Sequence, residues 1–181
     1  MAKALFLDRD GTIIRHVPYL HRPEDVELTP GAADALHAAR AAGYRLFLLT
    51  NQSGVARGYF TLDEVERVNA RMFALLNLGV EAFAGVCIAT EHPDEPPVYR
   101  KPSPRYILEM MAAYRLDPAQ CWMVGDNESD WHAGLQAHIR VAAVRSDLFS
   151  PTAAGIAHAH ALPVFESLGG FVAHLLPAHE A

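Results

Sequence analysis

The chain has 181 residues, of which 51% are hydrophobic and 20% charged, and 15 Lys and Arg against 21 Asp and Glu give a formal net charge of −6. This composition is typical of a globular protein and excludes a disordered chain, which combines low hydrophobicity with high net charge. A net negative surface repels nucleic acid and anionic lipid, so we expect neither as a partner. No apolar run approaches the ~18 residues that span a bilayer.

The N-terminal stretch and the cysteines of the chain favour a cytoplasmic protein. Only a short apolar stretch precedes Asp8, so we expect no signal peptide. Two cysteines, Cys87 and Cys121, are too few for a disulfide framework. No long unpaired apolar stretch stands out, and a monomer is therefore the default expectation.

Short apolar runs alternate with helical patterns along the chain. In chain order they predict a strand at 4–7, a helix at 31–42, a strand at 45–49, a helix from Thr61 to Leu75 or Leu76, a strand at 85–89, a helix at 104–114, a strand at 122–124, a helix at 129–137 and a strand at 141–144. Thr61 and Glu64 form the pattern of a capping box, which marks a helix start. From Phe149 onward we expect surface helices and one further candidate strand at 162–165.

This alternation predicts an α/β fold, a Rossmann-like three-layer arrangement with a parallel sheet and helices on both of its faces. The stretch from Thr50 to Lys101 has room for one helix, one strand and a loop, so we expect no large cap domain. We expect a single domain over 1–181, with the motif-bearing core at about 3–146 and a C-terminal strand and helix segment at about 147–176.

Four polar clusters stand where ligands bind in such sheets, at the carboxyl ends of the strands. Three follow strands directly and one precedes a helix: Asp8-Arg9-Asp10-Gly11-Thr12, Thr50-Asn51-Gln52-Ser53-Gly54, Gly125-Asp126-Asn127-Glu128-Ser129-Asp130 and Arg100-Lys101-Pro102. Carboxylates this close would repel one another and protonate unless a cation lies between them. Oxygen ligands favour Mg²⁺, and Lys101 adds a second positive charge that can hold a phosphate.

The spacing of Asp8 and Asp10 suits two chemical roles. In an extended stretch, residues i and i+2 project to the same side, so both carboxylates can face one substrate. One can attack phosphorus while the other protonates the leaving oxygen and later deprotonates the attacking water.

Together the four clusters resemble, in order and spacing, the four motifs of the haloacid dehalogenase superfamily, and Asp10 is typical of its phosphatase branch. The resemblance implies a hydrolase that cleaves phosphate monoesters, with Asp8 as nucleophile and Asp10 as general acid and base. Thr50 and Lys101 would hold the transferred phosphoryl group. Asp8, the main-chain carbonyl of Asp10, and Asp126 would bind one Mg²⁺, and Asp130 would support them.

Within the superfamily, the strings at 8–12, 50–58 and 100–102 resemble a capless subgroup that contains heptose bisphosphate phosphatases and histidinol-phosphate phosphatases. This favours a small phosphate ester as substrate, and a sugar bisphosphate such as D-glycero-D-manno-heptose 1,7-bisphosphate in particular. The alternatives are histidinol phosphate, a broad range of sugar phosphates, or a non-catalytic binding module. The intact Asp8, Asp10, Lys101 and Asp126 argue against the last of these.

Loops at 16–19, 53–60 and 91–100 are expected to select the substrate. The candidate substrate contacts are Arg9, His16, Tyr19, Asn51, Gln52, Ser53, Arg57, His92, Arg100 and Asn127. Arg100 is the best candidate for a distal phosphate or carboxylate, because its planar fork binds either in a bidentate manner. Three alternatives stay open: Arg9 in a structural ion pair, Arg57 as a surface residue, and Asp130 as a helix N-terminal charge.

Many members of the subgroup carry a zinc loop before the Arg-Lys-Pro string, with four Cys and His ligands. Here the segment 90–99 is short, Val98 and Tyr99 stand where the later cysteines belong, and only His92 remains. We therefore expect no structural zinc. Three prolines stiffen the segment instead by restricting its unfolded states.

Overall fold

A computed structural model describes residues 2–176, and its centre is one parallel β-sheet. The predicted domain boundaries at residues 1 and 181 lie outside the described residues. The six strands are β1 (Ala2–Leu7), β2 (Tyr44–Asn51), β3 (Phe83–Ala89), β4 (Leu116–Gly125), β5 (Arg140–Val144) and β6 (Val164–Phe165). Their order is β3-β2-β1-β4-β5-β6, and every neighbouring pair is parallel. The predicted α/β class is confirmed.

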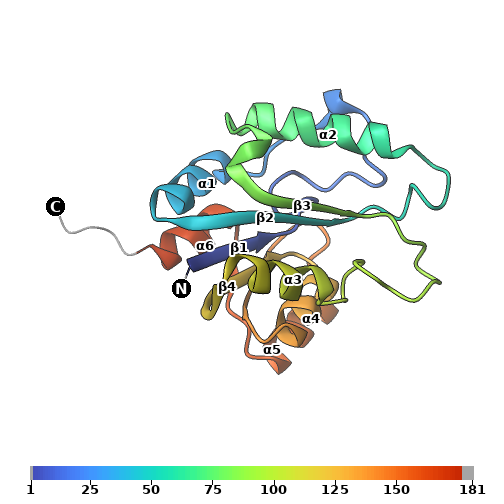
Figure 1. The fold of residues 1–181 in the computed structure, drawn as a ribbon. Coiled ribbons are helices and arrows are strands. Elements are labelled where there is room, and N and C mark those ends of the chain that lie inside the picture. The colour runs from blue at the N-terminus through green and yellow to red at the C-terminus, as the bar shows by residue number, and fades with distance from the viewer. Residues whose placement is uncertain (1, 177–181) are drawn as a thin grey trace.

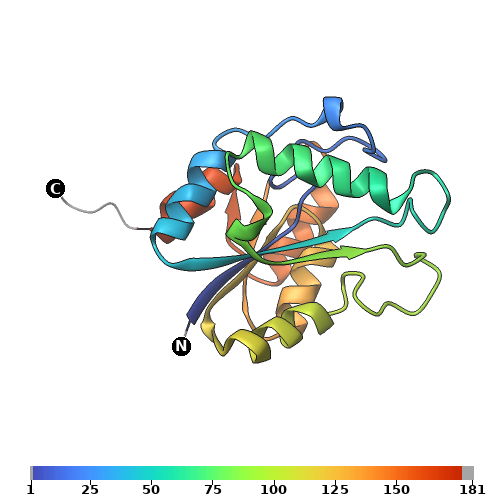
Figure 2. The same ribbon diagram turned by 45° about the horizontal axis from the view of Figure 1, so that its top comes forward.

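Helices cover both faces of the sheet (Figure 1). They are α1 (Ala32–Ala41), α2 (Leu62–Leu75), α3 (Arg105–Tyr114), α4 (Glu128–Gln136), α5 (Pro151–Ala159) and α6 (Leu168–Leu175), with short 3₁₀ turns at Pro23–Asp25 and Val80–Ala82. Side chains of α1, α2 and α6 share one hydrophobic core with the sheet, and those of α3, α4 and α5 share the other. Figure 2 shows α2 and α3 on opposite sides of the strands.

Alternation along β1 divides the two cores. Leu5 and Leu7 point into the core under α1 and α2, whereas Ala4 and Phe6 point into the core above α3 and α4. Phe6 stacks on Phe47 of β2 with ring centroids 4.8 Å apart. Because both faces are covered, β1 reads as a continuous apolar run, which is why the sequence predicts it well.

Two elements differ from the sequence prediction. Strand β4 begins at Leu116, well before the predicted start at Trp122, because Leu116 pairs with Ala2 before the register shifts. Helix α6 is not a surface helix: Leu168, Phe171 and Val172 are buried, and the helix packs on α1. The candidate strand at 162–165 is confirmed in part, as the short β6 beside β5.

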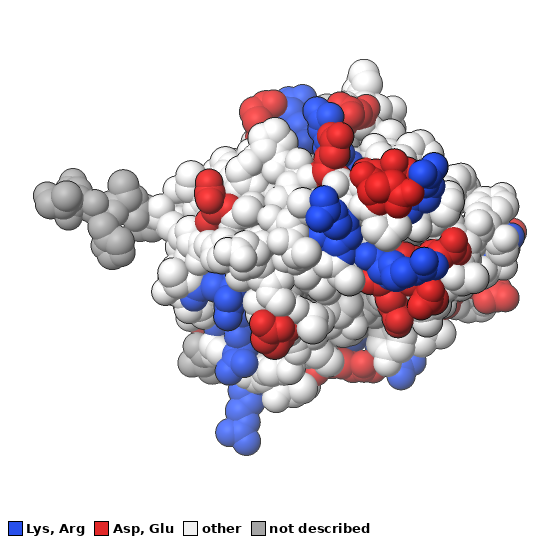
Figure 3. Space-filling model, turned by 90° about the horizontal axis from the view of Figure 1, so that it is seen from above, with Lys and Arg blue, Asp and Glu red and all other residues white. Residues whose placement is uncertain are grey.

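The single stretch between β2 and β3 holds α2 and a short 3₁₀ turn, so no large cap covers the carboxyl edge of the sheet. The predicted capping box starts α2, with the Glu64 N–H donating to Thr61 Oγ1 at 3.2 Å and the Thr61 N–H donating to Glu64 Oε2 at 2.7 Å. Charges of both signs are interspersed over the face seen in Figure 3. Within residues 2–176, no helix is long and apolar enough to cross a membrane.

Candidate active site

The predicted polar clusters meet at the carboxyl edge of the sheet. Asp8 directly follows β1, Thr50 and Asn51 end β2, and Asp126 directly follows β4. The chain order switches direction between the neighbouring strands β1 and β4, and ligands bind at such a switch point in open α/β sheets. The buried strands therefore bring side chains from distant parts of the sequence to one place.

Lys101 reaches this place from the segment between β3 and α3. Its Nζ lies 2.5 Å from Asp8 Oδ1 and 2.6 Å from Asp130 Oδ1, and it donates to the main-chain oxygen of Leu49 at 2.8 Å. Burial alone would lower the pKa of Lys101, but the charges of Asp130 and Asp8 outweigh it and raise that pKa. Lys101 is thus a fixed positive charge beside the expected nucleophile.

A buried acidic cluster lies around Lys101. Carboxylate oxygens of Asp8, Asp126 and Asp130 all lie within 4.8 Å of one another. Burial raises the pKa of Asp8 to about 7 against the opposing charge of Lys101, and burial followed by the charge of Asp8 raises the pKa of Asp126 to about 7. The pKa of Asp130 is also raised, chiefly by burial. Such a cluster stays ionised at neutral pH only if additional positive charge balances it.

Gly11 lets Asp126 approach the loop that follows β1. Its φ is +82°, and a Cβ placed on it would lie 2.1 Å from Asp126 Oδ2. A side chain at this position would therefore collide with the carboxylate as well as strain the backbone. Only glycine allows the loop after Asp10 and the Asp126 carboxylate to share this space.

Asp10 is held by three neighbours. Its carboxylate accepts hydrogen bonds from Arg9 Nε at 3.0 Å, Arg9 Nη2 at 3.2 Å and Gln52 Nε2 at 2.9 Å, with a longer contact from Thr50 Oγ1 at 3.4 Å. The Gln52 amide also donates to Thr50 Oγ1 at 2.8 Å. Gln52 and Thr50 thus orient the side chain that the sequence assigns to proton transfer.

The expectation that Arg9 contacts substrate needs correction. Arg9 is fully buried and its Nη1 donates to Asn69 of α2 at 2.8 Å, while its other nitrogens face Asp10. A guanidinium enclosed in this way cannot reach a molecule in the site. The alternative, a structural ion pair, agrees with the geometry: Arg9 Nη2 and Asp10 Oδ2 are 3.0 Å apart.

Two asparagines that the sequence suggests as substrate contacts form hydrogen bonds with the backbone of the protein. Asn51 accepts from the Lys101 N–H at 2.9 Å and donates to the Lys101 carbonyl at 3.1 Å, so it fixes the backbone of the lysine. Asn127 caps α4 by accepting from the Ser129 N–H at 3.0 Å, and its own N–H donates to Asp130 Oδ2 at 3.1 Å. Asp130 therefore both caps α4 and pairs with Lys101.

Two of the cavities at this edge adjoin each other at the predicted polar clusters. The first, of about 230 Å³, is lined by Asp8, Asp10, His16, Asn51, Arg100, Lys101, Asp126, Asn127, Ser129, Asp130 and Leu148. The second, of about 260 Å³, is lined by Asp10, His16, Val17, Pro18, Tyr19, Leu20, Asn51, Gln52, Ser53, Gly54 and Phe60. Asp10, His16 and Asn51 belong to both. A molecule that fills both cavities therefore passes Asp10.

The remaining candidates lie at the rim or beyond it. Tyr19 is exposed and meets Tyr59 edge-on, with ring centroids 4.8 Å apart. Arg57 is exposed and lines neither cavity. Burial lowers the pKa of the half-buried Arg100, and the positive charge of Arg57 lowers it further. His92 also lines neither cavity, and its Nδ1 accepts from the Asp94 N–H at 3.3 Å.

The sequence reading missed two residues. The Ser146 side chain lies close enough to Asp126 to oppose the rise of its pKa. Its signal was available, because Ser146 follows β5 closely, as the other site residues follow their strands. Glu91 accepts hydrogen bonds from the backbone beside Arg100, and no local pattern in the sequence indicates this.

Comparisons with known proteins show the family of the chain. A profile of the haloacid dehalogenase-like hydrolases matches residues 19–138. The chain belongs to this family. The hydrolase is 38% identical over 142 residues to a D-glycero-β-D-manno-heptose-1,7-bisphosphate 7-phosphatase of Helicobacter pylori, covering 76% of this chain and 80% of that one. It is 37% identical over 147 residues to the enzyme of the same name from Pasteurella multocida, covering 77% and 79%.

This haloacid dehalogenase-like hydrolase is also similar in structure to solved phosphatases. The D,D-heptose 1,7-bisphosphate phosphatase of B. bronchiseptica, complexed with magnesium and phosphate, matches with a TM-score of 0.86 and 27% identity over 96% of this chain and 97% of that one. The enzyme of the same name from Burkholderia thailandensis matches with a TM-score of 0.64 and 25% identity over 96% and 98%. The match over nearly the full length of both chains agrees with a fold that lacks a large cap.

Proposed function

We propose that this hydrolase is a Mg²⁺-dependent phosphatase that removes one phosphate group from a sugar bisphosphate through an aspartyl-phosphate. The observation that carries the proposal is the arrangement around Asp8: Lys101 lies 2.5 Å from its carboxylate, and Asp10 borders both cavities. One cavity then takes the phosphate that is transferred, and the other takes part of the sugar. The relatives named heptose bisphosphate phosphatases support this substrate class.

In the first half of the reaction, an oxygen of Asp8 forms a bond to phosphorus and the ester P–O bond breaks. Asp10 enters this step protonated and gives that proton to the departing sugar oxygen, which leaves as an alcohol. Between the two halves Asp10 is ionised and pairs with Arg9. In the second half, Asp10 takes a proton from water, the water oxygen bonds to phosphorus, and the Asp8–phosphorus bond breaks. Inorganic phosphate leaves, and both carboxylates return to their starting states. Lys101 balances the negative charge near phosphorus throughout.

The donor set at the site suits Mg²⁺. The buried carboxylates of Asp8, Asp126 and Asp130 offer hard oxygen ligands within 4.8 Å of one another, and their raised pKa values call for a balancing cation. Asp8, Asp126 and the main-chain carbonyl of Asp10 would hold one ion, and Asp130 would support them. When bound, Mg²⁺ supplies positive charge to the phosphate oxygens. We propose no structural zinc in addition.

The position of Arg100 supports a substrate with a second anionic group. Arg100 is half-buried in the wall of the cavity that holds Asp8 and Lys101, and Arg57 lies close enough to lower its pKa. A guanidinium in such a place binds a phosphate in a bidentate manner. The remaining substrate contacts that we propose are His16, Tyr19, Gln52 and Ser53, which line the second cavity.

The size of the cavities and the net charge bear on the partners and the location of the enzyme. A small phosphate ester fits cavities of this size, whereas the net charge of −6 and the interspersed surface charges in Figure 3 disfavour nucleic acid and membrane surfaces. We propose a cytoplasmic enzyme that acts as a monomer.

The decisive experiment compares wild type with Asp8→Asn on p-nitrophenyl phosphate, with and without Mg²⁺. We expect metal-dependent turnover that the substitution abolishes. Equal and negligible rates in both proteins would support the non-catalytic alternative. A second series measures kcat/KM for heptose bisphosphate, histidinol phosphate and sugar monophosphates. A preference of at least about tenfold for the bisphosphate is expected from the contact with Arg100. A preference for histidinol phosphate, or none, would refute the substrate assignment.

A further inference from the structure

Two side chains hold the backbone of Arg100 and Lys101 in place through hydrogen bonds. Glu91 Oε1 accepts hydrogen bonds from the Tyr99 N–H at 2.7 Å and the Arg100 N–H at 3.1 Å. Asn51 accepts from the Lys101 N–H at 2.9 Å. Three consecutive backbone N–H groups are thus fixed by side chains distant in the sequence. The direction of the backbone at these N–H groups determines where the side chains of Arg100 and Lys101 point.

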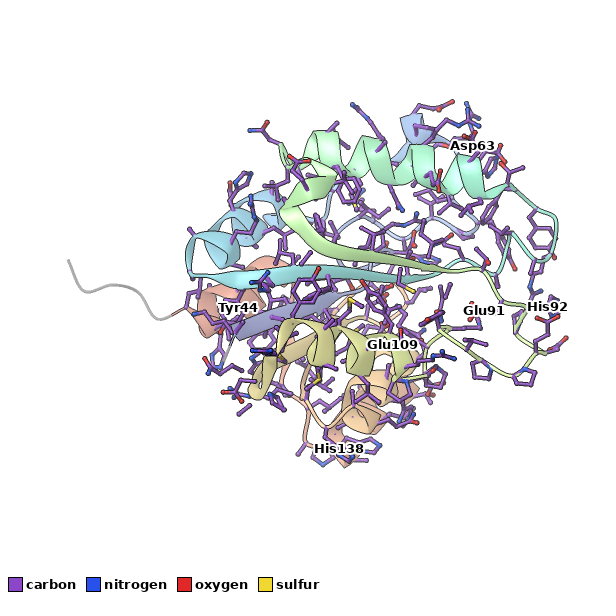
Figure 4. All side chains as sticks on the ribbon, viewed as in Figure 1. Tyr44, Asp63, Glu91, His92, Glu109 and His138 are labelled. Carbon is purple, nitrogen blue, oxygen red and sulfur yellow. The ribbon has the colours of Figure 1, made fainter. Side chains whose placement is uncertain are left out.

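Both anchors stand at the carboxyl edge of the sheet. Asn51 is the last residue of β2, and Glu91 follows the end of β3 at Ala89. In Figure 4, Glu91 lies at the base of the loop, nearer the sheet than His92. The outer part of the loop makes local contacts, such as the Glu95 N–H with the His92 carbonyl at 3.1 Å. The carboxylate of Glu91 therefore joins the returning end of the loop to the rigid part of the fold.

The charge of Glu91 also suits this position. Burial alone would raise the pKa of Glu91, but hydrogen bonds from backbone N–H groups, including those of Tyr99 and Arg100, outweigh it and lower that pKa. The carboxylate is then ionised at neutral pH, and hydrogen bonds to an ionised acceptor are among the stronger ones in proteins. The same negative charge opposes the effect of burial on the half-buried Arg100 guanidinium.

We propose that Glu91 is a positioning residue for substrate recognition: by holding the backbone of Tyr99 and Arg100, it aims the Arg100 guanidinium at the second anionic group of the substrate. This inference rests on the proposed function, because it assumes a substrate that carries such a group. Asn51 performs the matching task for Lys101, at the phosphate that is transferred. Glu91 and Asn51 would thus each position the cationic side chain that binds one end of the substrate.

The test uses Glu91→Ala, Glu91→Gln and the matched control Glu95→Ala, which removes an exposed carboxylate of the same loop. We expect Glu91→Ala to raise KM for heptose bisphosphate on the order of tenfold, because a displaced guanidinium loses its alignment. Its kcat and KM for p-nitrophenyl phosphate should stay within about twofold of wild type, since that ester lacks a second anionic group. Glu91→Gln keeps an acceptor oxygen and should recover most of the loss. Glu95→Ala should match wild type.

A double-mutant cycle with Arg100→Ala separates a positioning role from a merely structural one. If Glu91 acts through Arg100, the double variant has the same KM as Arg100→Ala alone. An unchanged KM in Glu91→Ala, or effects of the two substitutions that multiply, would overturn the proposal. Faster hydrogen exchange at the Tyr99 and Arg100 amides in Glu91→Ala is expected as well, and unchanged exchange would count against it.

The same experiment distinguishes failure of the proposed function. If wild type shows no preference for the bisphosphate, the substrate assignment fails, and the cycle is repeated with the ester that wild type hydrolyses best. A KM effect of Glu91→Ala that disappears in the Arg100→Ala background would still support Glu91 as a positioning residue. No effect of either substitution on that ester would overturn it.

Discussion

The carboxylate of Asp10 is the counter-ion of its neighbour Arg9, whose guanidinium is fully buried. The pair is asymmetric, because the Arg9 side chain is 1% exposed and the Asp10 side chain 19%. Asp10 alone can therefore gain water if its partner is removed, while Arg9 would remain enclosed with only the neutral Asn69.

This asymmetry predicts different costs for the two partners. Asp10→Asn leaves a buried cation without its counter-charge and should lower the free energy of unfolding by about 3 kcal/mol. Arg9→Met should cost less, about 1–2 kcal/mol, because Asp10 keeps its bond from Gln52 and gains solvent. The double variant should be more stable than Asp10→Asn alone. Urea unfolding of the three variants measures this, and strictly additive costs would contradict it.

The raised pKa of Asp126 predicts a link between pH, metal and stability. Its pKa of about 7 in the fold exceeds the ordinary value of 3.8, so folding favours the protonated form. That stabilisation is complete below about pH 3.8 and is lost as the pH rises through about 7. We expect Mg²⁺ to raise Tm more at pH 8 than at pH 5.5. Without metal at pH 8, Asp126→Asn should melt above wild type by roughly 3 °C or more, about 1 kcal/mol.

Differential scanning fluorimetry at the two pH values, with and without Mg²⁺, measures both effects. Asp126→Asn should also lose the shift that Mg²⁺ produces. A Mg²⁺ shift that is equal at both pH values and is retained in the variant would contradict the assignment of Asp126.

Removal of Lys101 should affect both catalysis and folding. In Lys101→Met, Asp8 and Asp130 face each other without a cation, and the Leu49 carbonyl loses its donor. We expect kcat/KM for p-nitrophenyl phosphate to fall by about 100-fold or more, as when a charge-stabilising donor is lost. The loss of stability should be greater at pH 8 than at pH 5.5, because protonation relieves the repulsion. Arg67→Met, which breaks an exposed ion pair with Asp63, is the control and should change neither by much.

Gly11 and Gly58 offer a matched pair of substitutions. Both have positive φ angles, +82° and +71°, so alanine strains the backbone at either position, by about 1 kcal/mol. A Cβ on Gly11 would lie 2.1 Å from Asp126 Oδ2, whereas a Cβ on Gly58 would meet nothing within 4 Å. Gly11→Ala should therefore lose Mg²⁺ binding and turnover, while Gly58→Ala should lose only a little stability. Isothermal titration with Mg²⁺ and initial rates distinguish the two, and equal losses would refute the close-approach argument.

The sequence predicts the sheet and the strand-end residues well because both follow from local patterns. Asp8, Thr50 and Asp126 each end a buried apolar run, so their convergence follows from parallel pairing alone. The start of β4 is missed because Leu116 joins the sheet through a pairing with Ala2 that no local pattern encodes.

The roles of individual polar side chains are harder to predict, because they depend on which partner lies nearest. Asn51 is a candidate substrate contact in the sequence, yet its amide forms hydrogen bonds with the backbone of Lys101, which only the fold brings close. Asn127 instead caps α4 through the Ser129 N–H, two residues further along the chain. The role of Glu91 cannot be predicted from the sequence for the same reason, because its partners Tyr99 and Arg100 lie at the far end of a loop.

The ammonium group of Lys101 has three N–H donors; it donates hydrogen bonds to Asp8 and to the Leu49 carbonyl, and it forms an ion pair with Asp130 at 2.6 Å. A phosphate oxygen that approaches Lys101 competes with these acidic partners for its positive charge. If it replaces Asp8, the arriving phosphate itself releases the carboxylate that attacks it. Substrate entry and exposure of the nucleophile then become a single exchange of partners at one nitrogen atom.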